Sequence, residues 1–123
     1  MANSANNGPA RVVIVDDEDM VITSIRAFLQ LETEYVVNGF TSPEEAVKYL
    51  ETTPADVVIS DYMMLEMRGD ELATKVRHLA PSQPILMLTG SFEMVEGCSP
   101  QLDAVLTKPF SIGDLRAAIA RLC

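Results

Sequence analysis

The chain has 123 residues, of which 48% are hydrophobic and 22% are charged, values that fit one globular domain with a single core and exclude global disorder. Its 9 Lys and Arg against 18 Asp and Glu give a net charge of -9, which argues against binding to nucleic acid or to an anionic membrane surface. The two cysteines, Cys98 and Cys123, match neither a metal-ligand spacing nor a disulfide framework, and no apolar run approaches the ~20 residues of a membrane span, so we expect a cytoplasmic protein.

The chain is expected to begin with a flexible polar tail over residues 1–10, followed by one domain over residues 11–123. In this domain, short runs rich in β-branched residues alternate with longer amphipathic stretches, the pattern of strand–helix units around a parallel sheet. The predicted strands cover residues 11–15, 35–40, 55–60, 84–89 and 104–107. The first, third and fourth are almost continuously apolar, as expected of central strands that helices cover on both faces.

Five helices are predicted between and after these strands. Two have readable starts, since Ser42 with Glu45 predicts a capping box and Ser111 with Asp114 predicts a weaker one. Apolar residues at three- and four-residue spacing predict the buried faces of the first, third and last helices: Ile22, Ile25 and Leu29; Leu72, Val76 and Leu79; Ile112, Leu115, Ile119 and Leu122. The stretch over residues 90–103 contains glycines and a proline, so its helix should be short, distorted or partly absent.

Polar side chains follow the predicted strands at the points where the strands end. The carboxyl ends of parallel strands meet at one edge of an open sheet, where such folds bind their ligands. We therefore expect one site that gathers the side chains of Asp16, Asp17, Asp61, Thr89 and Lys108.

Three carboxylates in one place repel one another, and two like charges ~4 Å apart cost about 4 kcal/mol at an effective dielectric of ~20. Mg²⁺ suits such a place, since it binds one or two carboxylates, keeps several waters and accepts a phosphate oxygen. Together with the ammonium of Lys108 and the hydroxyl of Thr89, these groups predict a site for a phosphoryl group. Asp61 stands alone on a central strand and is the candidate nucleophile, which would form an acyl phosphate.

Four segments, in this order, resemble the response regulator receiver domain of two-component signalling, as in chemotaxis regulators. They are "VVIVDDED", "VVISDYMM", "ILMLTG" and "LTKPF". The resemblance covers the chain from Arg11 to Leu122. It implies an α/β fold of the flavodoxin-like, doubly wound type, with a five-stranded parallel sheet of order 2-1-3-4-5 and five helices.

The resemblance also implies the roles of the site residues. Asp61 would be the phosphorylation site, and Mg²⁺ would be bound by Asp17, Asp61 and the backbone carbonyl of Met63, with Asp16 assisting directly or through water. The phosphoryl donor would be a phosphohistidine on a sensor kinase or a phosphotransfer protein. The phosphorylated domain would then switch a surface that binds an unknown downstream protein or output domain, as a monomer or weak dimer without turnover of an independent substrate.

The resemblance also assigns the phosphoryl-binding residues and the parts of the implied switch. Thr89 and Lys108 would bind phosphoryl oxygens, and the Lys108–Pro109 peptide bond is expected to be cis, a form essentially confined to proline. Val105 stands where the family commonly has tyrosine or phenylalanine, the ring whose rotation reports phosphorylation. That readout is not expected here in its usual form.

Two other departures from the family lie near Asp61. Leu65 stands where the family usually has proline, so we expect a less rigid loop. Met63, two residues beyond Asp61, places an apolar side chain on the path of hydrolytic water, while Gly90 leaves room for a phosphodonor. This pair predicts a long-lived phosphoaspartate.

Three other functions share part of the pattern. A degenerate receiver would act only as an interaction module, against which the intact set of site residues argues. An aspartate-nucleophile phosphatase of the haloacid dehalogenase type would use Asp17 and Asp19 as its Asp-x-Asp motif, but the chain lacks room for a substrate-covering cap. A flavodoxin-like FMN protein needs a phosphate loop after the first strand, where this chain has four consecutive acids over residues 16–19.

Overall fold

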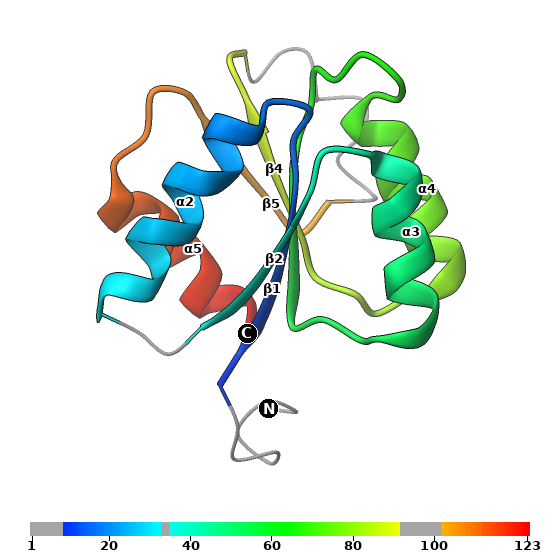
Figure 1. Cartoon of the computed structure of the whole chain (residues 1–123), viewed down its shortest axis with the longest axis horizontal. Coiled ribbons are helices and arrows are strands. Elements are labelled where there is room, and N and C mark those ends of the chain that lie inside the picture. The colour runs from blue at the N-terminus through cyan, green and yellow to red at the C-terminus, as the bar shows by residue number, and fades with distance from the viewer. Residues whose placement is uncertain (1–8, 33–34, 92–101) are drawn as a thin grey trace.

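A computed structural model describes residues 9–32, 35–91 and 102–123, which form a five-stranded parallel sheet with helices on both faces (Figure 1). The strand order is β2-β1-β3-β4-β5, as predicted. Helices α2 and α5 lie on one face, and α3 and α4 lie on the other. The elements are β1 (Arg11–Val15), α2 (Asp19–Glu32), β2 (Val36–Phe40), α3 (Pro43–Thr52), β3 (Val57–Asp61), α4 (Gly69–Leu79), β4 (Ile85–Thr89), β5 (Ala104–Thr107) and α5 (Ile112–Leu122).

The strands agree with the sequence prediction to within two residues at each end, and the fold class is confirmed. Four helices are present in the part of the chain that the structure describes. The fifth predicted helix, between β4 and β5, falls largely on residues 92–101, which lie outside the described residues, as does most of the expected tail. The domain begins no later than Ala10, which is buried and whose carbonyl accepts a hydrogen bond from the Val36 amide.

The core consists of two apolar layers, one on each face of the sheet. All five residues of β3 and all five of β4 are buried, which explains why these strands read as continuous apolar runs. Ile22, Ile25 and Leu29 pack under α2 as predicted, and Leu115 and Ile119 do the same under α5.

One predicted core position is wrong. Leu72 and Val76 of α4 are buried, but the side chain of Leu79 is 42% exposed. The reason is its place in the helix, since Leu79 is the last residue of α4 and the chain turns away at Ala80. Leu79 keeps the three- and four-residue spacing of the apolar positions, but at the end of α4 this spacing no longer places the side chain against the sheet.

Both predicted helix caps are present, but the complete capping box is at α5 and not at α3. Ser111 and Asp114 form the full reciprocal capping box of α5, in which each side chain accepts from the other residue's backbone N–H. At α3 the Ser42 hydroxyl accepts from the Glu45 amide, with proline at the first position of the helix. Both helices therefore start where their sequences indicate.

Helix α4 begins in direct contact with the strands that carry the site. Gly69 is its first residue, and its amide donates to the carbonyl of Tyr62 at 2.8 Å. A Cβ atom on Gly69 would lie 2.5 Å from the Met87 sulfur and 2.8 Å from the backbone carbonyl oxygen of Asp61. Only glycine permits this close approach, which fixes the loop between β3 and α4 against the sheet.

Within the described residues, no helix is long and apolar enough to cross a membrane.

Candidate functional site

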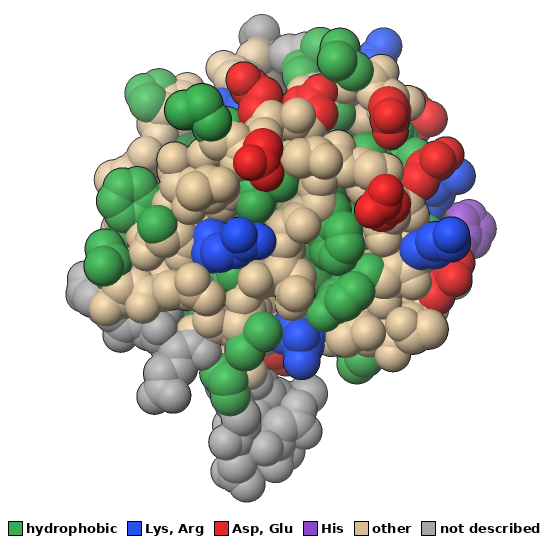
Figure 2. Space-filling model, in the orientation of Figure 1, with side chains coloured by type: hydrophobic (Ala, Val, Ile, Leu, Met, Phe, Trp, Pro, Cys, Tyr) green, Lys and Arg blue, Asp and Glu red, His purple; other side chains and the backbone are tan. Residues whose placement is uncertain are grey.

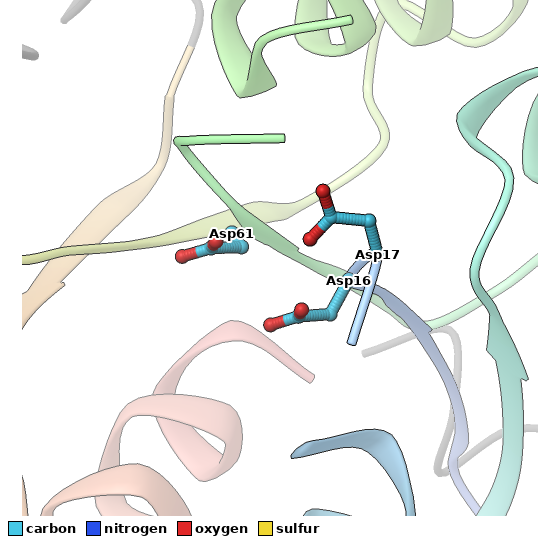
Figure 3. Close-up of side chains that lie close together, drawn as sticks. All are labelled: Asp16, Asp17 and Asp61. Atoms are coloured by element: carbon cyan, nitrogen blue, oxygen red, sulfur yellow. The ribbon is translucent and has the colours of Figure 1, made fainter. Parts of the chain in front are cut away.

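The site lies where β1 and β3 end side by side. Val15 of β1 pairs with Ser60 of β3, so the next residues, Asp16 and Asp61, lie at the same level of the sheet. Figure 3 shows that the side chains of Asp16, Asp17 and Asp61 lie close together, and a carboxylate oxygen from each lies within 4.8 Å of the others. The structure therefore brings together the three acids that the sequence singles out.

The Asp16 carboxylate is almost completely enclosed, with 2% of the residue exposed. Its pKa is raised to about 6, chiefly because burial disfavours its charged form. A hydrogen bond at 2.9 Å from the Glu18 amide and the charge of Lys108 act in the opposite direction, whereas the carboxylates of Asp61 and Asp17 raise the pKa further. Burial and the two neighbouring carboxylates therefore outweigh the groups that favour the ionised form of Asp16.

Lys108 supplies the positive charge that faces Asp61. The distance from its Nζ atom to Oδ1 of Asp61 is 2.8 Å, and its backbone amide donates to the Thr89 carbonyl at 2.7 Å. Lys108 directly follows β5, whose last residue, Thr107, pairs with Thr89 of β4. This pairing places Lys108 at the same edge of the sheet as Thr89. The Lys108–Pro109 peptide bond is cis, the isomer expected from the sequence.

Thr89 lies at the same edge, but its hydroxyl is engaged elsewhere. The residue is buried, and its Oγ1 atom donates to the Ser91 carbonyl at 3.1 Å and accepts from the Ser91 amide at 3.2 Å. The sequence predicts a hydroxyl aimed at a phosphoryl group. In this structure the hydroxyl instead closes the turn after β4.

The loop after β3 contributes a group that the sequence analysis missed. The Leu65 amide donates a hydrogen bond to Oδ2 of Asp17 at 2.9 Å. The signal was present in the sequence, because leucine at this position has an N–H that proline lacks. The loop that was expected to be less rigid is tied to the acid cluster by this bond. Met63, two residues earlier, has a 56% exposed side chain.

Tyr62 is a second residue that was not singled out. It is buried and packs with Met87 of β4, against Leu102 and Val105. A side-chain hydrogen bond with Tyr62 is also the main cause that raises the pKa of the Arg68 guanidinium. The small Val105 therefore lies beside a buried tyrosine ring that comes from the residue directly after Asp61.

The donor set fits a hard divalent cation. Three carboxylates offer oxygen ligands at one point, and the ammonium of Lys108 is paired with one of them, Asp61. Acidic side chains also gather in the upper part of the surface in Figure 2, the side on which β1 ends in Figure 1. The site suits Mg²⁺ by ligand type and by charge.

Comparison with known proteins gives a consistent assignment. The family model of the response regulator receiver domain matches residues 12–120. The alkaline phosphatase synthesis transcriptional regulatory protein PhoP of Bacillus subtilis is 32% identical over 112 residues, which make up 89% of this chain and 46% of that protein. Response regulator RppA of a Synechocystis strain is 36% identical over 117 residues, 91% of this chain and 50% of that protein. The chain spans about half the length of these curated relatives.

Solved structures share the fold over nearly their whole length. Chemotaxis protein CheY4 of Vibrio cholerae superposes with a TM-score of 0.85 at 30% identity, covering 94% of this chain and 100% of that one. Response regulator protein TrrA of Thermotoga maritima, determined in complex with Mg²⁺-BeF, gives a TM-score of 0.85 at 27% identity, with 93% and 99% covered.

Proposed function

Because the chain belongs to the response regulator receiver domain family, we propose that it accepts a phosphoryl group from a phosphohistidine onto Asp61 and thereby switches a partner-binding surface. The observation that carries this proposal is the position of Asp61, which is paired with Lys108 at 2.8 Å and lies within 4.8 Å of the acids Asp16 and Asp17. A nucleophilic carboxylate, a cation and a metal-binding pair of acids thus converge on one point.

The transfer step is a displacement at phosphorus. A carboxylate oxygen of Asp61 attacks the phosphorus atom of the donor's phosphohistidine, the new O–P bond forms, and the P–N bond breaks with its electron pair returning to the imidazole. The product is an acyl phosphate on Asp61. Asp61 is only 8% exposed, and its Oδ1 atom is bonded to Lys108, so little of the side chain is open to solvent before the donor binds.

Mg²⁺ would be held by the carboxylates of Asp17 and Asp61 and by the backbone carbonyl of Met63, with Asp16 assisting directly or through water. When bound, the ion supplies positive charge to the acids and to a phosphoryl oxygen. The clustering of the three carboxylates supports this assignment. The structure of the Thermotoga maritima relative in complex with Mg²⁺-BeF adds to that support.

Phosphorylation would redirect two side chains. The phosphoryl group adds about 1.5 to 2 negative charges and three acceptor oxygens. Lys108 would exchange its bond with Asp61 for one of these oxygens, and the Thr89 hydroxyl would leave the Ser91 backbone to reach another. The loops after β4 and β5 would move with them, which biases a two-state surface.

The proposed partners follow from this role. They are a histidine kinase or phosphotransfer protein as donor, and a downstream protein or output domain as receiver of the signal. We further propose a cytoplasmic domain, monomeric or weakly dimeric, that neither binds nucleic acid directly nor turns over an independent substrate. The net charge of -9 supports the absence of direct contact with nucleic acid.

The alternatives are weaker for structural reasons. A phosphatase would need Asp17 and Asp19 in one site, but Asp19 is the exposed first residue of α2 and does not belong to the acid cluster. An FMN phosphate would meet that same cluster and be repelled. A function as an interaction module alone would not explain the ion pair between Asp61 and Lys108.

The decisive experiment is phosphoryl transfer to the purified chain from a radiolabelled phosphodonor with Mg²⁺. We expect stoichiometric labelling, loss of the label in Asp61→Asn, and loss of labelling when EDTA removes the ion. Asp19→Asn is the matched control, because a receiver keeps its label in this variant and a phosphatase would lose its activity. Failure of every donor to label the parent chain would favour the interaction module.

A further inference from the structure

The bond between Leu65 and Asp17 joins two loops that are 48 positions apart in the sequence. The Leu65 side chain is 94% exposed, so the residue contributes to the site through its backbone and not through its side chain. The bond connects the loop after β1, which carries Asp16 and Asp17, with the loop after β3, which carries the Met63 carbonyl.

We propose that the Leu65 amide is a positioning group of the metal site, which holds one oxygen of Asp17 so that the other faces the cation. This inference rests on the proposed function only for the identity of the ion.

The hydrogen bond with Leu65 involves only one of the two Asp17 carboxylate oxygens. A carboxylate has two oxygens, and the amide occupies Oδ2 of Asp17, which leaves Oδ1 free for a ligand. Carboxylates that bind metals are themselves commonly held by hydrogen bonds, and loss of such a bond typically costs 10- to 100-fold in metal affinity.

The same hydrogen bond also limits the distance between the two loops that would bind the metal. Met63 precedes Leu65 by two residues, so the same bond limits how far the Met63 carbonyl can move from Asp17. Gly69 anchors the far end of this loop to the Tyr62 carbonyl at 2.8 Å. Ordering the two ligand-bearing loops before the ion arrives lowers the entropy lost on binding.

Leu65→Pro tests the proposal, because it removes the N–H, and Leu65→Ala is the matched control that removes the side chain but keeps the N–H. Amide chemical shifts followed during a Mg²⁺ titration should give a dissociation constant for Leu65→Ala close to that of the parent. The constant for Leu65→Pro should be about tenfold higher. Equal or tighter binding by Leu65→Pro, or loss of affinity in Leu65→Ala as well, would overturn the proposal.

A second measurement uses the parent chain and needs no folded variant. Hydrogen exchange of the Leu65 amide should be slowed without metal and should stay slow, or slow further, at saturating Mg²⁺. Faster exchange with Mg²⁺ would mean that the ion displaces the bond, which would overturn the inference. Neither measurement uses a phosphodonor. Failure of Asp61 to accept a phosphoryl group would therefore contradict the proposed function without changing the result for the Leu65 amide.

Discussion

The ammonium of Lys108 lies 2.8 Å from the Asp61 carboxylate and is the cation that directly faces this acid among the described residues. The pair is half open to water, because 42% of the Lys108 side chain is exposed. Its contribution to stability therefore depends less on the isolated pair than on the two further carboxylates nearby.

Replacement of Lys108 by methionine should destabilise the metal-free protein. The variant keeps most of the apolar side chain and removes the charge, so the three carboxylates repel one another without an opposing cation. We expect the free energy of unfolding at neutral pH to fall by about 1 kcal/mol, as measured by urea denaturation. Lys75→Met on the exposed face of α4 is the control and should stay within about 0.5 kcal/mol of the parent. Equal losses in both variants would contradict the prediction.

The pKa of Asp16 predicts how stability varies with pH in the absence of metal. The pKa is raised from 3.8 to about 6 in the folded state, so between these values the folded protein holds a proton that the unfolded chain has released. Stability is therefore expected to fall as pH rises from about 4 to 6, and the loss is complete above the folded pKa. The shift would correspond to about 3 kcal/mol for an isolated group, and we expect about 1–2 kcal/mol because water reaches Asp17 and Lys108.

The measurement is urea denaturation of the parent and of Asp16→Asn between pH 4 and 7. The slope attributed to this carboxyl group should be absent in the variant. Saturating Mg²⁺ should flatten the slope of the parent, since bound cation favours the ionised acid. A parent protein that gains stability relative to Asp16→Asn as pH rises through this range would refute the assignment.

Met63 is predicted to slow hydrolysis of the phosphorylated form. Its side chain is 56% exposed at the loop after Asp61, so it can cover the acyl phosphate without being fixed in the core. Met63→Asn should speed dephosphorylation several-fold, because the amide can hold a water that the thioether excludes. Decay of radiolabelled protein after removal of the donor measures this rate. Met63→Leu, an apolar side chain of similar volume, should leave it nearly unchanged, and an unaltered decay in the Asn variant would count against the idea.

Gly69 should tolerate no side chain. A Cβ atom there meets the backbone carbonyl oxygen of Asp61 at 2.8 Å, and because a backbone atom cannot swing aside, the start of α4 must shift. We expect Gly69→Ala to lower the free energy of unfolding by about 1–3 kcal/mol. Gly113→Ala in α5 is the matched control, since its added Cβ meets only the Ser111 hydroxyl oxygen at 3.6 Å and should be neutral or stabilising. Thermal unfolding of the two variants distinguishes these outcomes.

Much of the fold could be predicted because its determinants are local. The apolar runs of β3 and β4 mark buried parallel strands, and the acids and hydroxyl at their ends mark the site, since parallel strands deliver their ends to one edge. The exposure of Leu79 could not be read from helical period alone, because the period does not say where a helix leaves the sheet.

The finer features of the site depend on groups that side-chain patterns do not reveal. The bond between Leu65 and Asp17 uses a backbone amide, and the engagement of Thr89 with Ser91 depends on the turn after β4. The position of Tyr62 was accessible in principle. The two-residue period of β3 continues past its end, which places Tyr62 on the same face as Val58.

Lys108 follows the edge strand β5, whereas Asp16 and Asp61 lie at the ends of the central strands β1 and β3. This arrangement affects partial unfolding of the domain from its edge. If β5 and α5 were to detach, Asp16 and Asp61 would remain close together at the ends of β1 and β3, and Asp61 would lose its ion pair with Lys108. The electrostatic cost of that state opposes partial unfolding from the edge. The same residues that suit phosphoryl chemistry therefore make the folding of the outer strand cooperative with that of the central ones.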